Sequence, residues 1–127
     1  GVAVAFEPEP GMLVQSLADW DRLRGEVTAP NFGLALDVGH VPCTESISAG
    51  EAIRKYGPSL RTVHLDDSRN GVHEHLQIGD GELDWPDIGR ALRDVRFTGI
   101  ASVELSRHSH AAVVAAGVAI GRLREAL

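Results

Sequence analysis

The sequence predicts an α/β fold in which parallel strands alternate with helices. Short apolar, β-compatible runs are each followed by a stretch whose apolar residues recur at helical spacing. Such alternation favours a parallel sheet with right-handed crossovers. Each expected strand also leads into an ionisable residue, as in parallel α/β barrels, where functional groups sit at the carboxyl ends of strands. The expected strands are 1–6, 32–37, 60–65 and 97–105, and the expected helices are 12–24, 45–56, 85–95 and 110–127.

The first expected strand places Val2, Val4 and Phe6 on one side and small residues on the other, which suits a crowded interior. Prolines and a glycine end the strand directly after Glu7. Apolar residues at helical spacing then predict the helix over 12–24.

The second expected strand ends in Asp37-Val38-Gly39-His40, around which the chemistry of the chain is organised. Ionisable groups at the end of an apolar strand cost free energy unless something pairs them. Asp37 and His40 offer an oxygen and a nitrogen that suit a divalent metal, with the alternative that Asp37 only caps a polar turn. His40 and Cys43 could form a metal pair as well, against the alternative of a free thiol in a loop.

The third expected strand leads into His64-Leu65-Asp66-Asp67, and a long polar loop is expected from there to about Leu83. Asp84-Trp85-Pro86 predicts a helix start, with Asp84 as the N-cap and the proline in the first turn. The fourth strand carries Glu104 near its end, and an alanine-rich helix follows it.

The residues at the four strand ends form a possible ligand set. Carboxyl ends of parallel strands converge in a barrel, so residues distant in sequence can meet at one ion. Three carboxylates and one imidazole suit Mn²⁺, Mg²⁺, Co²⁺ or Zn²⁺. The alternative is a coincidence of caps and satisfied polar residues. The set consists of Glu7, Asp37, His64 and Glu104.

A second group of histidines follows the third strand. His73 and His75 are two residues apart, so on an extended segment they point the same way, and His40 could join them. Three imidazoles make a plausible second zinc-like site. The same residues could instead bind substrate hydroxyls or simply be surface histidines.

Composition and charge narrow the class of protein. The formal net charge is −6, and the arginines and lysines are scattered among acids, so a nucleic-acid binder is not expected. No apolar run is long enough for a transmembrane helix, and the first residues do not have the pattern of a signal peptide. The single cysteine, Cys43, favours a reducing, cytoplasmic setting.

Five motifs occur in a characteristic order and cover nearly the whole chain. They are Glu7 after the first strand, Asp37-Val38-Gly39-His40 after the second, His64-Leu65-Asp66-Asp67 after the third, His75-x-x-Ile78-Gly79-x-Gly81, and Val103-Glu104-Leu105. In these motifs the chain resembles the carboxyl-terminal half of the xylose isomerase-like TIM-barrel superfamily. That superfamily includes sugar isomerases and epimerases, hydroxypyruvate isomerase, inosose dehydratase and endonuclease IV.

The resemblance implies roles for the strand-end residues. Glu7, Asp37, His64 and Glu104 would bind one divalent metal. Glu7 and Glu104 would also be the acid–base pair that moves the substrate proton, as in the sugar epimerases of the superfamily.

The resemblance also implies roles for residues around this set. His40 would contact substrate, or a further zinc ion as in endonuclease IV. His73 stands where endonuclease IV has an aspartate, and His75 matches one of its histidines. Arg69 and Arg107 are candidates for binding substrate oxygens or phosphate.

The superfamily barrel has eight strands, and four are expected here. We therefore expect residues 1–127 to form a single region, a (β/α)4 half of a TIM barrel that pairs with a missing amino-terminal half or with a second copy of the chain. Open strand edges make catalysis by this region alone doubtful.

The leading functional interpretation is a metal-dependent isomerase or epimerase of a small sugar, sugar phosphate or hydroxy-carbonyl compound. The alternatives are a metal-dependent dehydratase or lyase, a phosphodiesterase of the endonuclease IV type, and a non-catalytic half-barrel. The acidic balance of the chain weakens the phosphodiesterase alternative.

Overall fold

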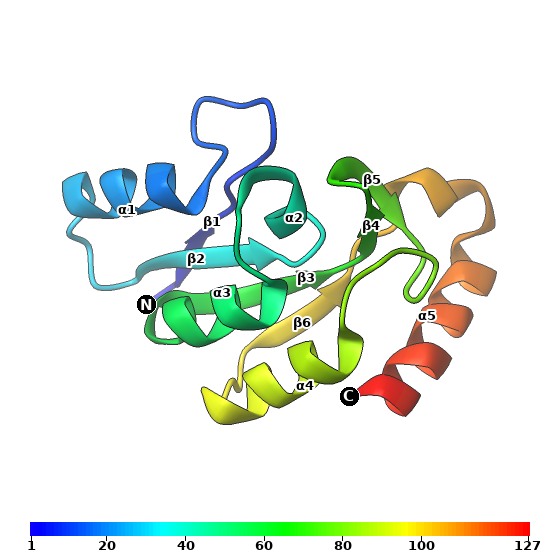
Figure 1. Ribbon diagram of the computed structural model, residues 1–127. Helices are drawn as coiled ribbons and strands as arrows, with labels where there is room; N and C mark the ends of the chain where they lie inside the picture. The colour runs from blue at the N-terminus through cyan, green and yellow to red at the C-terminus, as the bar shows by residue number, and fades with distance from the viewer.

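The structure is a computed structural model that describes residues 1–127, and it confirms the α/β fold with a parallel sheet (Figure 1). The sheet has the order β1-β2-β3-β6, and all neighbouring strands are parallel. The carboxyl ends of the four strands therefore lie along one edge of the sheet. The strands are β1 Val4–Phe6, β2 Phe32–Asp37, β3 Leu60–Leu65 and β6 Ile100–Val103.

Helices connect the strands of this sheet, and α3 and α4 lie side by side against it (Figure 1). None of the helices combines the length and the apolar character needed to cross a lipid bilayer. The α-helices are α1 Leu17–Glu26, α2 Val41–Thr44, α3 Ala49–Tyr56, α4 Trp85–Asp94 and α5 Ala112–Ala126, and the 3-10 helices are η1 Gly57–Ser59 and η2 Ser106–Ala111.

Local capping decides where three of the helices begin. Ser16 and Ser48 form capping boxes with Asp19 and Glu51, so both side chains satisfy backbone N–H groups that the first turn leaves free. The Asp84 side chain accepts a hydrogen bond from the first turn of α4, which confirms the expected N-cap.

Three expected helices begin later in the structure than predicted, and capping residues explain two of these starts. The helix expected over 12–24 begins only at Leu17, because the capping box at Ser16 starts it there. The helix expected over 45–56 begins at Ala49, after the cap at Ser48. The last helix, expected from residue 110, begins at Ala112 after the turn η2.

The polar loop expected after β3 contains an antiparallel hairpin, β4 Asp67–Arg69 and β5 Val72–Leu76. Asn70 and Gly71 form its turn, and both have a positive φ, 54° and 66°. Asn-Gly is the preferred pair for this left-handed turn, because it tolerates positive φ at both positions. The hairpin places a second layer of side chains above the ends of the sheet strands.

The core lies between the sheet and its helices. Leu34 and Leu36 of β2 and Val63 of β3 are buried, as are Ile53 of α3 and Ile88 of α4. The edge strands are less covered: Val4 of β1 is 52% exposed and Ile100 of β6 is 72% exposed.

The first prediction tests this core. Ile53 is fully buried, so Ile53→Ala removes apolar contacts and leaves a cavity. We expect the free energy of unfolding to fall by about 2–5 kcal/mol, measured by urea denaturation of the complete protein. Val113→Ala is the control, because Val113 is 88% exposed on α5. Equal losses in the two variants would contradict the assignment of Ile53 to the core.

Candidate metal centre

The structure brings the four strand-end residues together. Their ligand atoms all lie within 4.8 Å of one another, although Glu7 and Glu104 follow the two opposite edge strands of the sheet. Nδ1 of His64, in β3, is 3.0 Å from Glu7 Oε1 and 2.8 Å from Glu104 Oε2. Asp37, the last residue of β2, completes the group. These four residues are called the carboxylate site below.

Three acidic groups around one imidazole shift the pKa of that imidazole. The hydrogen bond to Glu7, together with the charges of Glu7, Glu104 and Asp37, raises the pKa of His64 to about 9 against the effect of its burial. Burial raises the pKa of Glu7, but the hydrogen bond and charge of His64 outweigh it and leave that pKa below its usual value. Both shifts show that the carboxylate site favours positive charge.

Asp37 offers an unpaired carboxylate oxygen at this site. Its Oδ1 accepts hydrogen bonds from the backbone N–H groups of Gly39 and His40, at 2.7 and 3.2 Å, so the carboxylate does cap the turn. Its Oδ2 is buried and has no hydrogen-bond partner. A bare buried carboxylate oxygen is costly unless a cation or a donor meets it. The donor set and this oxygen together fit a divalent metal ion.

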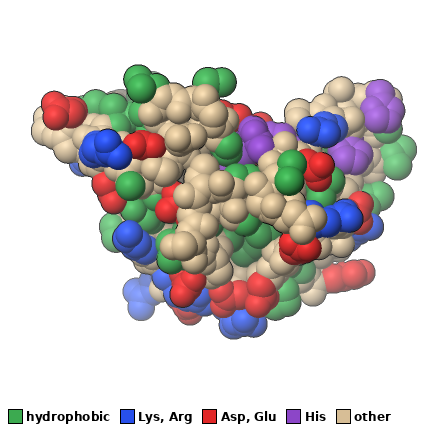
Figure 2. Space-filling model, turned by 45° about the horizontal axis from the view of Figure 1, so that its top comes forward, with side chains coloured by type: hydrophobic (Ala, Val, Ile, Leu, Met, Phe, Trp, Pro, Cys, Tyr) green, Lys and Arg blue, Asp and Glu red, His purple; other side chains and the backbone are tan.

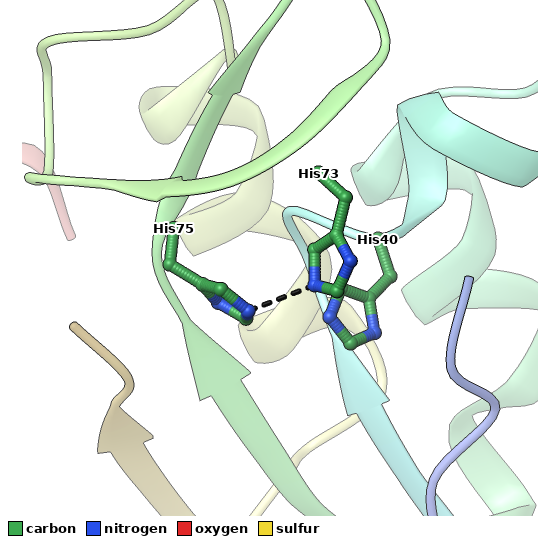
Figure 3. Close-up of side chains that lie close together, drawn as sticks. All are labelled: His40, His73 and His75. Atoms are coloured by element: carbon green, nitrogen blue, oxygen red, sulfur yellow. Dashed lines mark hydrogen bonds between the residues drawn. The ribbon is translucent and has the colours of Figure 1, made fainter. Parts of the chain in front are cut away.

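The three histidines form a second cluster (Figure 3). His40 is buried, and the other two are partly buried. The ring centroids of His40 and His73 are 4.6 Å apart, and those of His73 and His75 are 4.5 Å apart. His40 links the two clusters, because its Nε2 is 3.8 Å from Asp37 Oδ2. The residues His40, His73 and His75 are called the histidine cluster below.

The proton positions in the histidine cluster are restricted. His40 Nδ1 is 3.2 Å from the carbonyl oxygen of Pro8, which can only accept, so the neutral ring keeps its proton there and Nε2 bare. Nε2 of His73 is 2.8 Å from Nε2 of His75. Two such nitrogens cannot both carry protons, and a proton on one of them or a cation between them would make this contact favourable. Burial, with the neighbouring His40 and His75, lowers the pKa of His73 and keeps its ring neutral at pH 7.

Two acids that sequence reasoning missed also lie at the clusters. Glu9 has one oxygen 3.6 Å from His73 Nε2 and the other 3.9 Å from His40 Nε2. Asp66 Oδ2 is 2.7 Å from His75 Nδ1. Burial and the charge of Asp37 raise the pKa of Asp66 to about 10. In the sequence, Asp66 can be suspected as a site residue from its place directly after an apolar strand. Asp67 follows the same strand one residue later, so this position does not distinguish the two acids.

The remaining candidate residues lie as follows. Arg69 of β4 is exposed, and its guanidinium donates a hydrogen bond to the carbonyl of Asp80. Arg107 is exposed in η2. The Cys43 thiol donates to the carbonyl of Gly39 and belongs to none of the potential ligand groups, which favours the free thiol over a His40–Cys43 pair.

The two clusters occupy the edge of the sheet where its strands end. Figure 2 shows histidine side chains inside a hollow of this face, with acidic side chains beside them. The hollow, the convergent carboxylates and the parallel strands together define a barrel-type α/β protein with a group of potential metal ligands at its strand ends.

Comparison with known proteins identifies the family. The profile described as xylose isomerase-like TIM barrel matches residues 1–126, so the chain belongs to the xylose isomerase-like TIM-barrel family. D-psicose 3-epimerase of Enterocloster bolteae is 37% identical over 79 residues, which cover 62% of this chain and 24% of that protein.

Solved structures show the same fold. A D-tagatose 3-epimerase-like protein superposes with a TM-score of 0.78 at 20% identity, over 99% of this chain and 48% of that one. The IOLI protein with a bound zinc atom superposes with a TM-score of 0.76 at 23% identity, over 100% of this chain and 51% of that one. The chain thus spans about half the length of these structures.

The second prediction concerns metal binding. Asp37→Asn keeps the capping oxygen but removes one negative charge from the carboxylate site. Loss of a residue that only supports a metal ligand typically weakens metal binding about 10–100-fold, so we expect the loss of a ligand charge to lower Mn²⁺ affinity by at least that factor. Isothermal titration of Mn²⁺ into the complete protein measures it. Glu74→Gln is the control, because Glu74 belongs to neither cluster. Unchanged affinity in Asp37→Asn would contradict the metal assignment.

Proposed function

We propose that this chain supplies the metal-binding and proton-transferring residues of an isomerase or epimerase. The substrate would be a small sugar, sugar phosphate or other hydroxy-carbonyl compound. The observation that carries the proposal is that Glu7 and Glu104 reach one His64 nitrogen from opposite edges of the sheet. The epimerase among the sequence relatives supports the same chemistry.

The carboxylate site would hold the divalent ion, Mn²⁺, Zn²⁺, Mg²⁺ or Co²⁺, through Glu7, Asp37, His64 and Glu104. When bound, such an ion polarises the carbonyl and adjacent hydroxyl of an open-chain sugar and eases cleavage of the neighbouring C–H bond. The zinc atom of the IOLI structure supports a divalent ion in this fold.

The proton transfer itself is assigned to the two glutamates. One carboxylate removes the proton from the carbon next to the carbonyl, and the C–H electron pair moves toward the carbonyl oxygen. The other glutamate then delivers a proton to the opposite face of the same carbon, which inverts that centre. Isomerisation would instead need delivery of the proton to the former carbonyl carbon, together with transfer of the hydroxyl proton to the former carbonyl oxygen. The lowered pKa of Glu7 keeps it ionised at neutral pH, as a base must be.

The histidine cluster supports a second candidate, a phosphodiesterase that uses more than one ion. Three imidazoles whose ligand atoms lie within 4.8 Å could hold a second metal. The same nitrogens could bind substrate hydroxyls in an epimerase. The net charge of −6 is unfavourable for a nucleic-acid substrate, so the epimerase is the stronger candidate. Arg69 and Arg107 stay candidates for substrate contacts in either case.

We also propose that residues 1–127 are one region of a larger barrel. An amino-terminal half or a second copy of the chain would cover the edge strands β1 and β6. The half-length match to the solved structures and the exposed apolar residues at both edges support this assembly. A reducing, cytoplasmic setting is proposed on the single cysteine, Cys43, alone.

The third prediction tests the acid–base assignment. Glu104→Gln keeps the size and one ligand oxygen but cannot accept a proton, so turnover of a ketose should fall about 10²–10⁴-fold while the fold persists. The assay follows exchange of the substrate C–H proton with deuterated solvent, with and without a chelator. Product analysis separates epimerisation, isomerisation and dehydration.

Glu125→Gln is the matched control, because Glu125 is exposed on α5, outside both clusters. Wild-type turnover to the inverted or isomerised product in Glu104→Gln, or full activity after the metal is stripped, would remove this mechanism.

The fourth prediction tests the covered edge. If other strands pack on β6, Ile100→Asp buries an unpaired charge and should destabilise the complete protein by at least about 2 kcal/mol. Leu13→Asp should cost little, because Leu13 is 96% exposed in the loop after β1. Thermal unfolding of the two variants gives the comparison. If both variants unfold like the wild type, the edge of β6 faces solvent.

A further inference from the structure

Asp66 is a buried acid whose hydrogen bonding differs from that of the neighbouring Asp67. Asp67 accepts four hydrogen bonds, from the backbone of Ser68, Gly79 and Leu83 and from the Trp85 indole. Asp66 is 1% exposed, and its Oδ1 has no hydrogen-bond partner. A buried carboxyl group with an unsatisfied oxygen destabilises the fold. We therefore expect Asp66 to have a role other than stabilising the fold.

Asp66 contacts the histidine cluster at His75. Oδ2 of Asp66 lies 2.7 Å from Nδ1 of His75, although no hydrogen bond of standard geometry reaches that nitrogen. On the far side of the same ring, Nε2 of His75 faces His73 (Figure 3). A protonated Asp66 keeps one oxygen free to accept. With its own proton on Oδ1, the acceptor at Oδ2 favours a proton on Nδ1 of His75 and leaves the Nε2 lone pair directed into the cluster.

His40 has the matching arrangement on the other side of the cluster. Its Nδ1 faces the carbonyl of Pro8, and its Nε2 is buried without a partner. Two of the three imidazoles thus have an oxygen close to Nδ1, at 3.2 Å in His40 and at 2.7 Å in His75, and direct Nε2 inward. A cation or a substrate hydroxyl is bound by such lone pairs, and the acceptor behind each ring fixes its orientation.

Two features of the backbone, at Gly39 and at His75, accompany the contact between Asp66 and His75. A Cβ at Gly39 would lie 2.1 Å from Asp66 Oδ1, so only glycine lets the turn after β2 pack on this carboxyl group. His75 has a φ of 50°, a conformation that is strained for an L-residue and persists only where its surroundings hold it. Asp66 is the group in contact with its ring at Nδ1.

We propose that Asp66 is a positioning residue that orients His75 and sets its tautomer, so that the Nε2 lone pair of His75 serves the histidine cluster. This rests on the proposed binding role of that cluster. Asp66 acts from behind the ring and needs no contact with the bound group.

The test reads the tautomer directly in the metal-free complete protein. Nitrogen-15 NMR distinguishes protonated from bare ring nitrogens, at a pH about two units above the ordinary histidine pKa. We expect the His75 proton on Nδ1 in the wild type. Asp66→Leu keeps the branching without an acceptor, so the proton should leave Nδ1 or exchange between the two nitrogens. Asp66→Ala serves if leucine does not fit.

Asp66→Asn is the rescue variant, because its amide oxygen can still accept from Nδ1, and Glu74→Gln on the same hairpin is the control. We expect Asn and the control to keep the wild-type tautomer. An unchanged tautomer in both Asp66→Leu and Asp66→Ala would overturn the proposal.

Co²⁺ titration of the same variants separates this proposal from the function of the cluster. Absorption spectra should show about 10–100-fold weaker binding at the histidine cluster in Asp66→Leu, with the carboxylate site retained. A changed tautomer without any Co²⁺ at the cluster would support the positioning role and exclude a second metal. A changed tautomer with Co²⁺ affinity at the cluster equal to that of the wild type would overturn the role in ligand binding.

Discussion

The crowding of negative charge at the ends of four parallel strands is the constraint on which the rest of the site depends. Glu7, Asp37 and Glu104 approach one imidazole because parallel strands direct their carboxyl ends to the same edge. Without a metal, a proton on His64 balances part of this charge, which is why its pKa rises to about 9. A divalent cation would balance more charge and would also give the bare Oδ2 of Asp37 a partner.

The second layer of the site depends on the hairpin above the sheet. Asp67 anchors the segment after the hairpin through three hydrogen bonds, and the neighbouring Asp66 lies against His75. The two adjacent acids therefore have different roles: Asp67 accepts hydrogen bonds from backbone N–H groups and the Trp85 indole, and Asp66 contacts the His75 ring. The hairpin brings His73 and His75 to His40, so the histidine cluster is assembled from segments that only this tertiary arrangement brings together.

Sequence reasoning succeeds where one local rule dominates and fails where tertiary contacts decide. The strands ending at Asp37 and Leu65 were predicted because apolar runs end there in polar groups. The hairpin was missed although Asn70-Gly71 signals its turn, since its short polar strands do not alternate clearly. The apolar residues before Ser16 suggested an early helix start, but the capping box there takes precedence. Asp66 and Asp67 look alike in sequence, and only their neighbours in space distinguish them.

Binding of one divalent cation at the carboxylate site can be tested by anomalous diffraction from crystals of the complete protein soaked in Mn²⁺. We expect an anomalous peak at about 2.0–2.6 Å from ligand atoms of Glu7, Asp37, His64 and Glu104. Crystals that bind Mn²⁺ elsewhere, or not at all while His64 still bridges the two glutamates, would contradict it.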